Sequence, residues 1–183
     1  MPWFKKTPSS KPANLKEVMT SQEFGDFLFT LSANGASSFM TSLGSPEFPE
    51  TLEFSNKTEE IDQVELLIAY MWLFFDWMQQ PKYAEAFTRL HSRFMALVRE
   101  AGQDEKETWA LLQRRYDEYR RAHRTQGEVD NTYGKVAHEI QDNILGLNVP
   151  SVNIVFWVSL TVSIQEHLIA SGNLIKQIQI HDA

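Results

Sequence analysis

Asp76 is the residue whose surroundings most suggest chemistry, because it lies within the aromatic stretch WLFFDWM at residues 72–78. A carboxyl group half-buried among large aromatic side chains can have a raised pKa and serve as an acid or as an anchor for a ligand. The other interpretation is structural. Asp76 would then share a polar helical strip with Asp62 and Glu65, where it is solvated or paired with an arginine. Because about 16 Å of helix rise separates Glu65 from Asp76, they are not a catalytic pair, and the structural role is favoured.

Other catalytic and metal-binding patterns are missing from the sequence. No two of the five histidines are three or four residues apart on one expected helix, and Glu-x-x-His pairs do not occur, so neither a zinc clamp nor a di-iron site is expected. The chain has no cysteine, which excludes disulfides and thiol catalysis. Glycine-rich phosphate loops and the G-x-S-x-G nucleophile motif do not occur either. We therefore expect no metal and no cofactor, assign no catalytic residue, and favour a protein that is not an enzyme.

A run of large aromatic residues could form the wall of a pocket for an apolar ligand. It extends over residues 70–77, and simple core packing is the commoner role for such a run. If a ligand site exists, we expect it to draw on this run and on two residues of a later basic helix. The candidate ligand-binding residues are Tyr70, Trp72, Asp76, Trp77, Arg115 and Tyr119.

Charge argues against nucleic acid as a partner. The net charge is −7, and the arginine-rich stretch RRYDEYRRAHR at 114–124 is nearly balanced by nearby acidic residues, which is typical of a solvated, ion-paired face. The N-terminal text MPWFKK places Trp3 and Phe4 beside Lys5 and Lys6, so weak contact with an anionic membrane surface is an alternative to a loosely packed tail. We expect a basic tail at 1–13, a single domain at 14–183, and a cytoplasmic location.

The elements that would position these side chains are predicted to be helices. A capping box at Thr20 and Glu23 opens the first, and the turn signal Asn34-Gly35 begins a long loop at 32–57. Further helices are expected at 59–79, 82–101, from 104 to about 127, and 131–145. The apolar stretch LLIAYMWLFF at 66–75 is about half the length of a membrane-spanning helix, and we expect no span.

The stretch VNIVFWVSLTVSI at 152–164 poses the main structural question, because every even-numbered residue in it is apolar. That alternation is typical of a half-buried strand. However, a strand of this length needs partners, and the short texts TLEF (51–54) and IQIHD (178–182) do not match it. We favour a central helix from Pro150 to Ser171, in which hydroxyl side chains bond back to carbonyls one turn earlier.

Two short motifs resemble a group of small, uncharacterised, all-helical bacterial proteins. In that group an aromatic helix carries a motif of the type L-F-x-x-D-R and a later helix carries R-x-x-E-Y. The text WLFFDW supplies Asp76, with Trp77 in place of arginine, and RYDEY supplies Arg115, Glu118 and Tyr119. The resemblance spans about residues 60–172. It implies a helical fold and a contact between Asp76 and Arg115 or another cation, and it implies no activity.

We therefore predict an all-α, single-domain bundle of five to six helices with two central apolar helices. The first functional hypothesis is a non-enzymatic interaction or adaptor protein, with a protein partner or a second copy as in a homodimer. The alternative is a binder of a small apolar ligand between the aromatic helix 59–79 and the helix 150–171. An enzyme with a site around Asp76 is a third, weaker hypothesis.

Overall fold

A computed structural model describes residues 18–43, 63–124, 133–145 and 154–181, and it confirms an all-α fold. The helices are α1 (Ser21–Leu43), α2 (Gln63–Trp77), the short 3-10 helix η2 (Pro81–Tyr83), α3 (Ala84–Glu100), α4 (Glu105–Arg124), α5 (Gly134–Leu145) and α6 (Ile154–Ile175). Two strands of two residues each, β1 (Val18–Met19) and β2 (Gln179–Ile180), pair in parallel. The expected basic tail, the text TLEF and the expected helix starts at 59, 131 and 150 lie outside the described residues.

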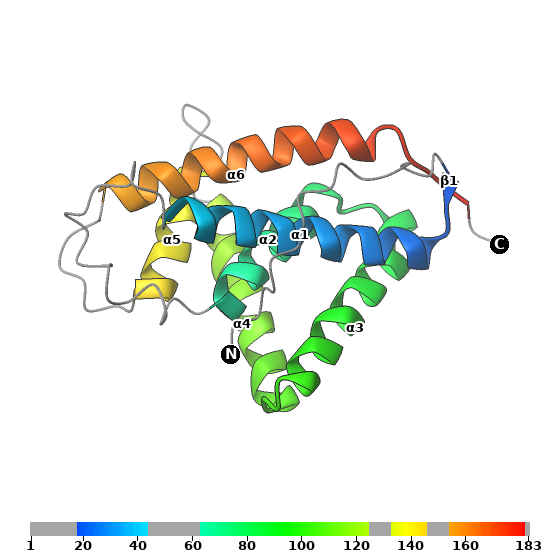
Figure 1. Ribbon diagram of the computed structural model, residues 1–183, viewed down its shortest axis with the longest axis horizontal. Helices are drawn as coiled ribbons and strands as arrows, with labels where there is room; N and C mark the ends of the chain where they lie inside the picture. The colour runs from blue at the N-terminus through cyan, green and yellow to red at the C-terminus, as the bar shows by residue number, and fades with distance from the viewer. Residues whose placement is uncertain (1–17, 44–62, 125–132, 146–153, 182–183) are drawn as a thin grey trace.

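The helix α2 forms the centre of the bundle. Every residue from Glu65 to Phe74 is buried, on all sides of the helix. It packs against α1, α4 and α5, and Figure 1 shows α6 lying along one side of the bundle while α3 and α4 meet in the opposite corner. Because α2 is apolar all round, enclosure by amphipathic neighbours is the arrangement that hides all of its surface from water.

The helix α1 corrects the sequence prediction, because it continues through Asn34-Gly35 to Leu43 where a turn and a loop were expected. The reason lies in packing. A Cβ atom added to Gly35 would lie 2.5 Å from Cδ1 of Tyr70 and 2.9 Å from Cε1 of His167. Gly35 therefore allows α1 to approach the buried Tyr70 ring of α2. The sequence pattern predicts a turn at this position because glycine is common in turns as well as at sites of close packing. The remainder of the expected loop, 44–57, is outside the described residues.

The segment after residue 154 is a helix, as favoured, but it is not enclosed as α2 is. Phe156, Leu160 and Ile164 are buried, whereas Val158 and Val162 are exposed. Two residues turn a helix by about 200°, so alternate apolar residues point to opposite sides of it. The period-two pattern is thus a helix with a buried apolar face and an exposed apolar face.

Local signals at the start of α1 and at the end of α3 are confirmed, whereas α6 continues beyond its expected end at Ser171 to Ile175. The Thr20 amide donates to Glu23 Oε2 at 3.1 Å and the Glu23 amide donates to Thr20 Oγ1 at 3.2 Å, which is the reciprocal pattern of a capping box. Gly102 has a φ of +70°. Its amide donates to the Arg99 carbonyl, and the Gln103 amide donates to the Val98 carbonyl. These bonds form a Schellman motif that ends α3 and opens the turn into α4.

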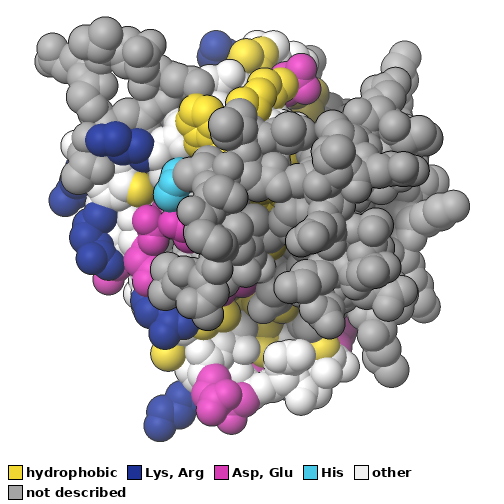
Figure 2. Space-filling model, turned by 90° about the vertical axis from the view of Figure 1, so that its left-hand side faces the viewer, with side chains coloured by type: hydrophobic (Ala, Val, Ile, Leu, Met, Phe, Trp, Pro, Cys, Tyr) yellow, Lys and Arg dark blue, Asp and Glu magenta, His cyan; other side chains and the backbone are white. Residues whose placement is uncertain are grey.

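A spacing of four residues predicts the intrahelical ion pairs Glu85–Arg89 and Asp117–Arg121, but the two arginines and Asp117 make other polar contacts. Arg89 donates to both carboxylate oxygens of Asp26 on α1, at 2.8 and 3.0 Å, rather than pairing with Glu85. Asp117 accepts from Arg120, while Arg121 donates to the Asp117 carbonyl. Basic and acidic side chains stand side by side on the face drawn in Figure 2.

Within the described ranges, no helix has both the length and the apolar character needed to cross a membrane.

Candidate functional site

Asp76 is held by a histidine rather than by an arginine. Its carboxylate lies 2.9 Å from Nδ1 of His123 on α4 and accepts a hydrogen bond of 3.0 Å from Nε2 of Gln79. The side chain of Asp76 is only 9% exposed. Arg115, the partner suggested by the bacterial group, binds other carboxylates. The cation beside Asp76 is therefore the imidazole of His123, whenever that ring is protonated.

Aromatic rings fix the orientation of His123. Its ring stacks on Tyr133, with 5.6 Å between centroids and 5° between planes, and meets Trp72 edge-on at 6.0 Å. Burial and the neighbouring Asp76 carboxylate raise the pKa of Tyr133. A carboxylate at Nδ1 is also how imidazoles are oriented in metal and catalytic sites. However, the described part of the chain contains no group of three His, Cys, Asp or Glu residues placed to hold a metal ion.

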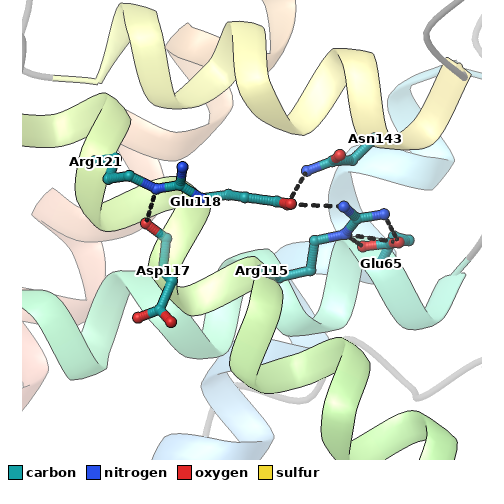
Figure 3. A network of polar contacts seen from close by, with 6 residues as sticks. All are labelled: Glu65, Arg115, Asp117, Glu118, Arg121 and Asn143. Atoms are coloured by element: carbon teal, nitrogen blue, oxygen red, sulfur yellow. Dashed lines mark hydrogen bonds and ion pairs between the residues drawn. The ribbon is translucent and has the colours of Figure 1, made fainter.

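Arg115 lies at the centre of a largely buried polar network between α2, α4 and α5 (Figure 3). Its guanidinium donates to both carboxylate oxygens of Glu65 and, at 2.7 Å, to Glu118, which also accepts from Asn143 at 3.4 Å. The side chains of Arg115 and Glu65 are 13% and 6% exposed. Burial alone would lower the pKa of Arg115, but the hydrogen bonds that it donates to Glu65 and Glu118 outweigh burial and raise that pKa. This network is a structural clamp that fastens α4 to the central helix.

The residues of the two motif-like stretches therefore lie in two separate contacts. Asp76 belongs to the His123 pair, whereas Arg115 and Glu118 belong to the clamp. The first motif also departs from the group's spacing, because Phe75 alone separates Phe74 from Asp76.

Three of the candidate ligand-binding residues lie in the packed core. Tyr70, Trp72 and Tyr119 are fully buried. The Tyr70 hydroxyl bonds to Ser163 Oγ at 2.8 Å, which replaces the carbonyl bond expected for that serine, and burial raises the pKa of Tyr70 to about 12. Trp72 and Tyr119 meet edge-on at 5.6 Å. These rings are packed into the core between the helices.

A pocket lies at the C-terminal ends of α2 and α6, beside Trp77. It has a volume of about 310 Å³ and is open to solvent on one side. Its lining comes from the end of α2, the residue before α5 and the last turns of α6, and consists of Trp77, Tyr133, Leu168, Ile169, Gly172, Asn173 and Lys176. Of the six candidate residues, only Trp77 lines it. Asp76 precedes Trp77 in the sequence. Its partner His123 stacks on Tyr133, which lines the pocket.

Gly172 makes the floor of this pocket possible. A Cβ atom at Gly172 would lie 3.2 Å from Cη2 of Trp77, so the indole rests directly against the backbone of α6. Trp77 is nevertheless 43% exposed and Ile169 is 67% exposed. Large apolar side chains left open to water around a concavity are typical of a binding site rather than of a folding core.

An exposed apolar stripe continues from the pocket along α6. Val158, Val162 and Ile169 recur at intervals of four and seven residues, which places them on one face of the helix. The opposite face, with Phe156, Leu160 and Ile164, is buried in the bundle. We call Val158, Val162 and Ile169 the α6 stripe.

His123 and most of the pocket lining were not identified from the sequence. His123 was placed on the apolar stripe of its helix, and nothing in the spacing indicated that α2 would bring Asp76 to it. One signal for the pocket was present in the even-numbered apolar residues of α6, because a helix with that pattern cannot bury them all on one face.

Comparison with protein-family models, with curated proteins and with solved structures found no match to this chain. The site is therefore interpreted from its own geometry.

Proposed function

We propose that this protein binds a small apolar or amphipathic molecule in the pocket between the ends of α2 and α6. The observation that carries the proposal is the combination of lining and exposure. Trp77, Leu168 and Ile169 present apolar surface to a solvent-open concavity, and polar groups appear only at its edge. A volume of about 310 Å³ falls at the lower end of the range of roughly 300–1,000 Å³ found for small-molecule sites.

The lack of a recognisable catalytic group at the pocket supports binding rather than conversion of a ligand. The lining supplies two aromatic rings, two aliphatic side chains, one amide and one amine. Asp76, the residue considered for acid chemistry, faces His123 and Gln79. The rings of Tyr70, Trp72 and Tyr119 are buried in the core, whereas Trp77 is exposed at the pocket, so we expect a ligand to bind at the ends of the two helices.

A titration with the neutral fluorescent probe N-phenyl-1-naphthylamine tests this proposal. We expect saturable binding by the wild type and a loss of at least ten-fold in affinity for Ile169→Glu, which places a charge in the apolar wall. The matched control is Val158→Glu, a change at another exposed position of the same helix, for which the affinity should stay within two-fold of the wild type.

Native mass spectrometry of protein purified from cells provides a second readout, in which a bound mass that Ile169→Glu removes would identify the natural ligand. Equal loss of probe affinity in both variants, or saturation that neither variant alters, would place the probe elsewhere and contradict the proposal.

The α6 stripe favours a second candidate function, which is docking of a protein partner or of a second copy of the chain. Val158 and Val162 are each nearly half-exposed although they lie outside the pocket, and ligand binding gives them no role. If a second copy covers the stripe, light scattering after size exclusion will show a dimer that Val162→Glu dissociates. A wild type that is monomeric at high micromolar concentration would count against self-association.

A further inference from the structure

Lys176 gives the pocket a charge preference. It is the one charged side chain in the lining, it is exposed, and it forms no ion pair within the described part of the chain. Asn173, in the last turn of α6, adds an amide to the same lining, and Lys176 follows directly after the helix. An apolar wall that ends in an ammonium and an amide matches a molecule with an apolar body and an anionic end.

Among the described residues, the backbone carbonyls nearest to Lys176 in the sequence already accept hydrogen bonds. Consecutive carbonyls at the end of α6 accept hydrogen bonds from within the chain: Gly172 from the Lys176 amide, Asn173 from Gln177 Nε2, Leu174 from the Gln177 amide and Ile175 from the Ile178 amide. The negative end of the helix is thus satisfied by the chain itself. Within the described part of the chain, the exposed Lys176 side chain has no ion-pair partner.

The carboxylate of Asp76, next to Trp77 in the chain, is turned away from the pocket. It is bound by His123 and Gln79 and is 9% exposed, and it is not part of the lining. Its charge is therefore compensated inside the bundle. Because the whole chain carries −7, an anion would approach most of its surface unfavourably, and a local cation is needed for any anion to bind.

We infer that the ligand is a single-chain anionic amphiphile taken up from solution, with its apolar chain against Trp77 and Ile169 and its carboxylate at Lys176 and Asn173. This inference rests on the proposed function, because it names the class of molecule that the pocket selects. The pocket size favours one chain rather than a two-chain lipid.

Calorimetric titration with three probes of equal chain length tests the inference: dodecanoate and dodecyltrimethylammonium below their critical micelle concentrations, and dodecanol below its solubility limit. We expect dodecanoate to bind two- to five-fold more tightly than dodecanol, as one solvent-accessible charge contact predicts, and dodecyltrimethylammonium to bind most weakly. Lys176→Gln should abolish the preference for dodecanoate, Lys176→Arg should keep it, and Lys106→Gln, at an exposed lysine of α4, should leave it unchanged.

The outcomes separate this inference from the proposed function. If dodecanol binds as tightly as dodecanoate, or if Lys176→Gln keeps the preference, the pocket is apolar without charge selection and the inference is overturned while the function stands. If none of the three probes binds, both fail. If the chain binds only to vesicles that contain an anionic lipid, and Ile169→Glu prevents that, the occupant is a membrane surface and the free amphiphile is ruled out.

Discussion

At the scale of single residues, a comparison of Arg115 with Arg120 distinguishes a buried ion pair from an exposed one. Its guanidinium neutralises Glu65 and Glu118 inside the bundle, where few water molecules can replace it. The Arg120–Asp117 pair lies on the same helix, but its carboxylate is 66% exposed. The two arginines are therefore matched in position and differ in burial.

We predict that Arg115→Ala lowers the free energy of unfolding by about 3 kcal/mol, because Glu65 would keep a buried charge without a partner. Arg120→Ala should cost at most about 1 kcal/mol, as exposed pairs do. Urea denaturation at pH 7 measures both. The penalty comes from the Glu65 carboxylate that is left without a partner. We therefore expect the double variant Arg115→Leu/Glu65→Leu to be more stable to urea than Arg115→Leu alone. Equal costs for the two alanine variants would show that the clamp contributes no more than a surface pair.

Two histidines make the fold sensitive to acid. Burial lowers the pKa of His91 and of His167 to about 4, against an ordinary value near 6.5 in the unfolded chain. Between those values the unfolded chain binds more protons than the folded chain, so stability is complete above about pH 6.5 and is lost as the pH falls toward 4.

We predict a loss on the order of 2–3 kcal/mol for each of these histidines over that window. Because carboxylates titrate in the same range, the measurement is a difference: urea denaturation at pH 7 and at pH 4.5 for the wild type, His91→Gln and His167→Gln. Each variant should lose less stability than the wild type between the two pH values. Variants with the same pH dependence as the wild type would mean that the buried rings are not neutral.

At the scale of helices, the sequence specified most of the fold through local rules. The capping box at Thr20 appears as predicted, and two further local rules hold, because Gly102 ends α3 and α3 buries one apolar stripe. The end of α1 was mispredicted, because Asn34-Gly35 has turn chemistry and only the tertiary contact of Gly35 with Tyr70 reveals its role. The pocket was missed for a similar reason, since its walls come from three separate elements.

Gly35 provides the test of that correction. We predict that Gly35→Ala destabilises the protein by about 1–3 kcal/mol, because the new methyl group overlaps the buried Tyr70 ring, although alanine favours a helix. Asn34→Ala, at the exposed neighbouring position, should be neutral or stabilising by a few tenths of a kcal/mol. Thermal unfolding compares them. A stabilised Gly35→Ala protein would show that α1 and α2 do not approach closely at this point.

The two faces of α6 give a second test at this scale. We predict that Leu160→Ala costs about 2–5 kcal/mol, as large-to-small changes in a core do, whereas Val162→Ala at an exposed position changes stability by about 0.5 kcal/mol or less. In a strand, residues 160 and 162 would share one face, so similar costs for the two variants would favour the strand interpretation. Urea denaturation of both variants decides between them.

At the scale of the whole molecule, the proposed binding pocket lies where the apolar helices α2 and α6 end. The bundle encloses α2 but covers α6 on one side only, and the last turns of α6 leave Trp77 and Ile169 open around a pocket. The clamp at Arg115 and the Asp76–His123 pair hold α4 against α2, and the His123 stack on Tyr133 supports one pocket wall. Asp76 and Arg115, two of the polar residues first considered for a ligand site, thus hold the helices beside the proposed pocket.

Mapping of amide chemical shifts by NMR tests this account most directly, with dodecanoate titrated into ¹⁵N-labelled protein. We predict that the shifts concentrate at the Trp77 indole N–H, at Tyr133 and at residues 168–176, with little change at the buried Trp72 indole or at Val158 and Val162. A titration without shifts, or shifts centred on Val158 and Val162 or on the core of α2 instead, would contradict the claim that the ends of α2 and α6 form the binding site.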